Sequence, residues 1–166
     1  YRHTTPLSID LRGGAEQTFE FGLVTAENFT GKFIQFSDIE ERSYLDWMDD
    51  FKGYVKSQKV DFVAVTGDIC YAQGLAINGQ EFNTDDVGVR KVYTMGNHDL
   101  IKGYKDSQGR DYGEKLYEDN FGPLWYSFNI EGVHYMVTPM LSGDAKPTYT
   151  PDDVYSWMRA DLETIP

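Results

Sequence analysis

The sequence has little cysteine and no long apolar run. Its one cysteine, Cys70, excludes an internal disulfide bond and leaves the redox compartment open. It contains no stretch of about 18 apolar residues, so a membrane-spanning helix is not expected. No signal peptide is recognisable, and the chain starts at Tyr1 without a methionine. Such a start suggests a processed form or a piece of a longer protein.

Basic residues are also scarce. Lys and Arg number 15 against 27 Asp and Glu, which gives a formal net charge of −12. A surface of this sign repels phosphates, so a nucleic-acid backbone is not expected as the main partner. Hydrophobic residues at 40% and aromatic residues at 15% exclude a disordered chain. The length suits one domain with a sizeable core.

Short continuous apolar runs predict the strands of a buried sheet. They occupy residues 33–36, 60–66 and 89–95, and we expect the first of them to be a buried central strand. Apolar residues at helical spacing predict a helix over about residues 42–57, whose aromatic stripe should face the core. Residues 73–87 are rich in Gly, Asn and Asp, which predicts a loop with about one helical turn near residues 80–82.

The second half of the chain predicts a helix, a hairpin and a final helix. The first helix should cover residues 113–121, and the dipeptide Glu131-Gly132 should join the two strands of the hairpin, residues 125–130 and 133–137. The last helix should follow Thr150 as its N-cap, with Pro151 in its first turn and Asp153 completing a capping box.

These elements indicate a layered α/β fold. Residues 1–27 alternate between apolar and polar positions and predict a hairpin or the end of a preceding domain. Residues 28–166 would then form the main domain, with a β-sheet flanked by helices. In an open α/β sheet the functional residues lie at the carboxyl ends of the strands.

Each of the three predicted strands ends in a residue suited to metal or proton chemistry. Asp38 follows the first run, Asp68 follows the second, and Asn97-His98-Asp99 follows the third. A single Asp after a strand is usually a turn former. Three such coincidences at strand ends that meet along one edge favour a common site.

The chemistry of these residues suggests separate roles. Asp38, Asp68 and Asn97 offer hard oxygen ligands, and a pair of divalent metal ions needs a carboxylate that bridges them. Asp68 is well placed to bridge, because the preceding glycine allows close approach of the backbone. His98 cannot point in the same direction as its neighbour Asn97, so it should face the substrate. Asp99 is available to orient His98 or to raise its pKa.

In their order and spacing, three short segments resemble the first three motifs of the calcineurin-like metallophosphoesterases. They are Phe36-Ser37-Asp38, Thr66-Gly67-Asp68 and Gly96-Asn97-His98-Asp99. The resemblance covers about residues 32–166. It implies an αββα sandwich, here incomplete, that hydrolyses a phosphate mono- or diester of a small molecule or a polymer.

The same resemblance implies a role for each motif residue. Asp38 would bind the first of two metal ions, Asp68 would bridge both, and Asn97 would bind the second. The ions would be divalent or of mixed valence, drawn from Mn, Fe, Zn and Mg, and a metal-bound hydroxide would be the nucleophile. His98 would contact the phosphate and protonate the leaving group, with Asp99 holding it.

The first motif departs from the family pattern. The family usually has Asp-x-His, whereas this chain has Asp38-Ile39-Glu40. Glu40 could serve as an oxygen ligand or could remain outside the site. Purple acid phosphatases also lack that histidine and carry a tyrosine ligand to ferric iron, and Tyr71 occupies the matching position. Cys70 is expected to pack as a small hydrophobe.

The histidines are the second departure. The family completes its site with three later histidines, and this chain has only His3, His98 and His134. His134 falls in the middle of a predicted strand, which indicates a structural residue. The chain therefore resembles the front half of a catalytic domain and is expected to be inactive alone.

A catalytically decayed domain with a binding or scaffold role is the alternative, supported by Glu40. A third reading is a calcium-binding module that uses one of the paired acids, but their spacing does not match a calcium loop. Lys102, Lys105 and Arg110 could hold a substrate phosphate or could be solvated loop charges. The acidic chain resembles exported bacterial members of the family, so a periplasmic or surface location is expected.

Overall fold

The structure is a computed structural model, and it describes residues 29–70, 72–82, 87–101 and 112–165. The hairpin or preceding domain predicted for residues 1–27 lies outside the described residues. No helix in the described segments is long and apolar enough to cross a membrane.

A three-stranded parallel sheet forms the centre of the fold. Its strands are β1 (Phe33–Phe36), β2 (Phe62–Val65) and β3 (Arg90–Tyr93), in the order β1-β2-β3. The three strands predicted from the apolar runs are confirmed. The central place predicted for the first run is wrong, because β2 occupies it and β1 lies at the edge. Burial alternates along β1, and Phe33 remains 49% exposed.

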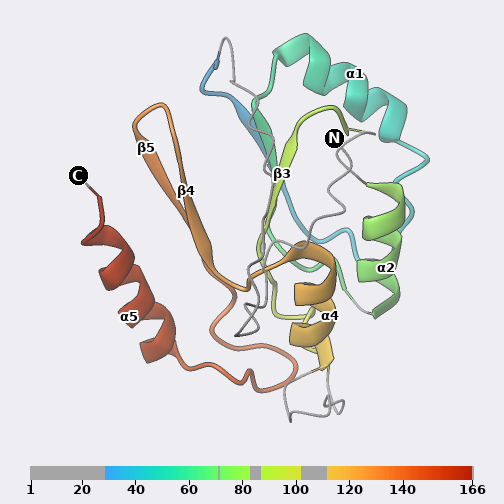
Figure 1. The fold of residues 1–166 in the computed structure, drawn as a ribbon. Helices are drawn as coiled ribbons and strands as arrows, with labels where there is room; N and C mark the ends of the chain where they lie inside the picture. Colours follow the sequence, from blue (N-terminus) through green and yellow to red (C-terminus); the bar gives the residue numbers. More distant parts are fainter. Residues whose placement is uncertain (1–28, 71, 83–86, 102–111, 166) are drawn as a thin grey trace, which may run out of the picture.

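Three helices lie on one side of this sheet: α1 (Met48–Gln58), α2 (Ala72–Glu81) and α4 (Tyr112–Phe121) (Figure 1). The aromatic stripe of α1 packs against the sheet as expected. The ring of Phe36 lies 6.1 Å from that of Trp47 and 5.8 Å from that of Phe51. The helix begins at Met48 rather than near residue 42. Residues 42–47 form turns and irregular backbone, and Trp47 is the N-cap with φ of −125° and ψ of 2°.

Helix α2 corrects the loop predicted for residues 73–87. Its glycines and asparagine are weak helix formers, but tertiary contacts outweigh that preference. Leu75 is fully buried, and Asn78 joins Tyr44 Oη and Tyr93 Oη at 2.6 and 2.9 Å. A side chain at Gly74 would lie 2.1 Å from the carbonyl oxygen of Ile69, so the glycine permits this close packing.

The predicted hairpin is confirmed on the opposite face of the sheet. It consists of β4 (Tyr126–Ile130) and β5 (Val133–Val137), which pair in antiparallel fashion. Glu131 and Gly132 both have positive φ, 48° and 78°, as a type I′ turn requires. Helix α5 (Pro151–Leu162) lies outside this hairpin, so the layers run helix, sheet, hairpin, helix (Figure 1). This layered α/β arrangement agrees with the fold class predicted from the sequence.

The start of α5 follows the predicted capping box. The hydroxyl of Thr150 accepts a hydrogen bond from the Asp153 amide at 3.3 Å, and the Asp153 carboxylate accepts one from the Thr150 amide at 2.8 Å. Asp153 is therefore part of a helix N-terminus, where negative charge is favourable, and this accounts for it without a calcium site.

Asp161 connects α5 to the hairpin. Its carboxylate accepts a hydrogen bond from Ser127 Oγ at 2.7 Å and lies 2.7 Å from Nε2 of His134. The Nδ1 of His134 lies 2.8 Å from Asn129 Oδ1. Both ring nitrogens of His134 are thus engaged within the β4–β5–α5 layer, in keeping with the structural role expected of this histidine.

We expect the contribution of Asp161 to stability to disappear in acid. The hydrogen bond from Ser127, assisted by His134, lowers the pKa of Asp161. A carboxyl group with a lowered folded-state pKa stabilises the protein above its unfolded pKa of about 3.9, and this is lost as pH falls through the folded value. Thermal melts should show Asp161→Asn below wild type at neutral pH, with a gap that narrows towards pH of about 2. Asp152→Asn on the same helix is the control, and an Asp161→Asn gap independent of pH would contradict the expectation.

Candidate functional site

The ends of the three parallel strands meet at one edge, as the sequence predicts. The amide of Asp38, after β1, donates to the carbonyl of Gly67 at 3.2 Å, and that of Glu40 donates to the carbonyl of Asp68 at 3.2 Å. The amide of His98, after β3, donates to Asp68 Oδ1 at 3.1 Å. Asp68 therefore contacts both neighbouring strand ends.

The Gly67-Asp68 turn and the Gly96-Asn97 turn approach one another more closely than side chains would permit. A Cβ atom on Gly67 would lie 2.5 Å from the Cα of Gly96, and one on Gly96 would lie 2.2 Å from Asp68 Oδ1. Gly67 also has φ of 89°, which favours glycine. The two glycines thus allow the second and third motifs to meet through their backbones.

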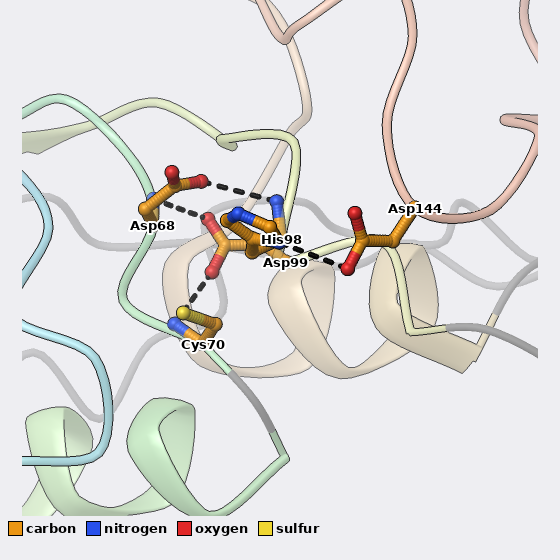
Figure 2. A network of polar contacts seen from close by, with 5 residues as sticks. All are labelled: Asp68, Cys70, His98, Asp99 and Asp144. Carbon is orange, nitrogen blue, oxygen red and sulfur yellow. Dashed lines mark hydrogen bonds and ion pairs between the residues drawn. The ribbon is translucent and has the colours of Figure 1, made fainter.

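The carboxylate of Asp99 holds these turns together. It is fully buried, and it accepts hydrogen bonds from the amides of Cys70 at 2.7 Å, Gly96 at 2.8 Å and Asp68 at 3.1 Å. Burial raises the pKa of Asp99, and the amides of Gly96 and Cys70 oppose that rise. Figure 2 shows this carboxylate pointing towards the turn that carries Asp68 and Cys70.

Asp144, rather than Asp99, is the carboxylate seen to bond to the His98 ring. The Nδ1 of His98 lies 2.8 Å from Asp144 Oδ2 (Figure 2). This corrects the role that the sequence assigned to Asp99, whose oxygens serve backbone amides. The hydrogen bond from Nδ1 of His98 to the Asp144 carboxylate raises the pKa of His98, which favours the protonated ring. Sequence reasoning missed Asp144, because no motif marks a residue so far along the chain.

The sequence offers three further candidate ligands: Glu40, Tyr71 and Cys70. The side chain of Glu40 is exposed, and its backbone amide is the part that contacts Asp68. Tyr71 lies outside the described residues, so its predicted role as a ligand stays a prediction. Burial raises the pKa of Cys70 to about 12, helped by the nearby Asp99 carboxylate. Its thiol therefore remains protonated, as expected of a small packed hydrophobe.

The chemistry of the donor set suits metal ions, but the described residues supply only part of a centre. Asp38, Asp68 and Asn97 bring oxygen donors to one edge, as hard cations require. Among the described residues, no group of three or more His, Cys, Asp or Glu side chains could hold an ion. Lys102, Lys105 and Arg110, which could contact a phosphate, lie outside the described residues.

A family model for the calcineurin-like phosphoesterases matches residues 31–162, which includes all three strand-end motifs. The chain belongs to this family. Members of this family generally have a dinuclear metal centre and act on phosphate esters.

A solved structure supports the fold of this calcineurin-like phosphoesterase chain. It is the purple acid phosphatase PPD1 from seeds of yellow lupin (Lupinus luteus), with a TM-score of 0.52 and 16% sequence identity. The alignment covers 81% of this chain and 28% of the lupin chain, so this chain spans about a quarter of that protein. No curated protein matches the chain significantly.

Proposed function

We propose that the complete protein hydrolyses a phosphate mono- or diester at the edge formed by Asp38, Asp68, Asn97 and His98. The observation that supports this most strongly is the meeting of three strand ends around Asp68, which contacts the loops of both neighbouring motifs. A hollow of about 520 Å³ lies beside this edge, lined by Asp38, Ile39, Arg42, Ser43, Asp46 and Trp47. It offers room for the group esterified to the phosphate.

His98 would serve as the general acid. Its side chain is 37% exposed at the site, and its Nδ1 is engaged by Asp144. Nε2 is then the nitrogen that would meet the leaving oxygen. As water attacks phosphorus and the bond to the leaving oxygen breaks, a proton from Nε2 would neutralise that oxygen. The products are an alcohol and a phosphate, or a phosphate monoester when the substrate is a diester.

Asp38, Asp68 and Asn97 would hold the metal ions. When bound, two such ions would neutralise charge on the phosphoryl group and lower the pKa of the attacking water. Tyr71 and Glu40 remain candidate additional ligands. The ions would be drawn from Mn, Fe, Zn and Mg, and a turnover assay with each metal added separately would identify them.

The test is turnover of aryl phosphate mono- and diesters by the complete protein, with each metal added separately. We expect metal-dependent hydrolysis that a chelator abolishes. Asp68→Asn should abolish most of it, because a neutral amide binds divalent cations more weakly than a carboxylate does. Asp49→Asn, an exposed carboxyl group on α1, is the matched control and should retain wild-type activity. Absence of turnover with every metal would overturn the proposal.

For the 166-residue chain alone we propose weak metal binding and little activity. Its described histidines are already committed, His98 to Asp144 and His134 to Asp161. Isothermal titration with manganese or zinc should therefore show low affinity. Tight binding of two ions per chain would contradict this.

A catalytically decayed domain is the second candidate, favoured by the exposed Glu40 where the family has histidine. Its test is the variant Glu40→His in the complete protein. A large gain in metal affinity favours decay of the site. An unchanged affinity, together with turnover by the wild type, favours a working centre that uses other ligands.

A further inference from the structure

We propose that Asp144 is the positioning residue for His98, fixing the ring so that Nδ1 is occupied and Nε2 faces the phosphate ester. The catalytic consequence rests on the proposed function, whereas the pairing itself does not. Asp144 Oδ2 lies 2.8 Å from Nδ1 of His98, within normal hydrogen-bonding distance (Figure 2).

Asp144 belongs to a segment, residues 138–150, that is fastened to the end of β3. The amide of Met140 donates to the carbonyl of Met95 at 3.0 Å, and the amide of Asp144 donates to the carbonyl of Asn97 at 3.1 Å. The backbone of Asp144 is therefore bound to the residue that immediately precedes His98. Its side chain therefore reaches the imidazole from a backbone that is hydrogen-bonded to the motif.

Gly143 allows this close contact. A Cβ atom at this position would lie 2.4 Å from the carbonyl oxygen of Asn97 and 2.7 Å from Cδ1 of Leu100. The first of these neighbours is backbone and cannot move aside cheaply. A larger residue at 143 would push Asp144 away from His98.

The other end of the segment is anchored to α4 by a buried carboxylate. Glu114 accepts hydrogen bonds from the amide and the hydroxyl of Thr148, at 2.7 and 2.5 Å, and is only 1% exposed. The hydroxyl of Tyr149 donates to the carbonyl of Met140 at 2.6 Å, which closes the segment on itself. Asp144 thus lies between two fixed points, as a group that orients another side chain must.

The His98–Asp144 pair is partly exposed, so its effect on the orientation of the ring can be measured apart from any effect on stability. The side chains of His98 and Asp144 are 37% and 34% exposed, so solvent screens their attraction and the fold gains little from it. Loss of Asp144 should therefore leave the melting temperature nearly unchanged. A hydrogen bond that adds little to stability still biases the orientation of the ring, and reaction rates fall steeply when a catalytic group is misplaced.

The first test is nitrogen NMR of the histidine side chains, which needs no turnover. The 166-residue chain has three histidines, and its variant His98→Gln identifies the signal of interest. In the wild type the neutral His98 ring should carry its proton on Nδ1. In Asp144→Ala it should divide between the two tautomers, whereas in the control Asp49→Asn it should not change. An unaltered His98 tautomer in Asp144→Ala would overturn the proposal.

The second test is kinetic. Asp144→Ala should lower kcat by roughly 10- to 100-fold with little change in KM, because the ring is misplaced but the metal ligands remain. Asp144→Asn, whose amide oxygen can still accept from Nδ1, should retain more activity than Asp144→Ala. Equal activity of wild type and Asp144→Ala would overturn the catalytic consequence. If the wild type has no activity, the proposed function fails, and the NMR result still decides the pairing.

Discussion

Replacing Asp99 by asparagine should lower the free energy of unfolding by about 3 kcal/mol, the largest stability effect we expect at the site. The asparagine oxygen could still accept the amides of Asp68 and Gly96. Its NH₂ group would then face the amide of Cys70, now 2.7 Å from Asp99 Oδ1. Two donors would meet in a fully buried place, and one of them would have no acceptor.

Desolvation of Asp99 opposes this effect but does not reverse it. Burial raises the pKa of Asp99, so removing its charge recovers part of the cost of burying a carboxylate. Three backbone amides depend on this group, and each buried donor left without an acceptor costs about 1–3 kcal/mol. The cost of leaving an amide unpaired therefore exceeds the recovered desolvation energy, and the substitution lowers the free energy of unfolding.

Urea denaturation of wild type, Asp99→Asn and Asp49→Asn measures the difference. The control replaces an exposed carboxyl group in the first turn of α1 and should change stability by less than about 0.5 kcal/mol. Asp99→Ala, which leaves all three amides unpaired, should be less stable than Asp99→Asn. A loss below about 1 kcal/mol for Asp99→Asn would show that the turns are held by other contacts.

Replacing His98 by glutamine should reduce kcat of the complete protein by about 10²- to 10⁴-fold on an alkyl phosphate. An alkoxide is a poor leaving group and needs a proton as its bond to phosphorus breaks. On an aryl phosphate with an acidic phenol the loss should be much smaller, because that leaving group departs as an anion. The dependence on the leaving group is the signature of a general acid.

The matched control for this prediction is His134→Gln. His134 lies in β5 and pairs with Asp161, away from the strand-end motifs. Its replacement should affect stability and leave the ratio of the two substrates unchanged. An equal loss on both substrates in His98→Gln would assign His98 to phosphate binding rather than to proton transfer.

The strand-end motifs could be predicted from the sequence because they depend only on adjacent residues. An apolar run that stops at Asp38, Asp68 or Asn97 predicts a strand and marks the edge where it ends. The hairpin turn at Glu131-Gly132 and the cap at Thr150 are equally local, since each depends on the backbone preferences of a few adjacent residues.

Helix α2 shows where local preference is insufficient. Gly74, Asn78 and Gly79 predict a loop by propensity. The helix forms because Leu75 enters the core and Asn78 bonds to tyrosines from two other segments. None of these partners is near in the sequence. The edge position of β1 could not be predicted either, because strand order depends on pairing between segments that are distant in the sequence.

The sequence by itself determined the family, the strand ends and the residues that offer oxygen ligands and an acid. These follow from the type and spacing of neighbouring residues. Only the tertiary structure decided that the Asp99 carboxylate accepts hydrogen bonds from backbone amides and that Asp144 bonds to the His98 ring. Both are carboxylates that could orient an imidazole, and the difference is where each lies: Asp99 is buried among three amides, whereas Asp144 is brought to His98 by a segment fastened at both ends. Such an arrangement depends on contacts between residues distant in the chain, which neither composition nor spacing records.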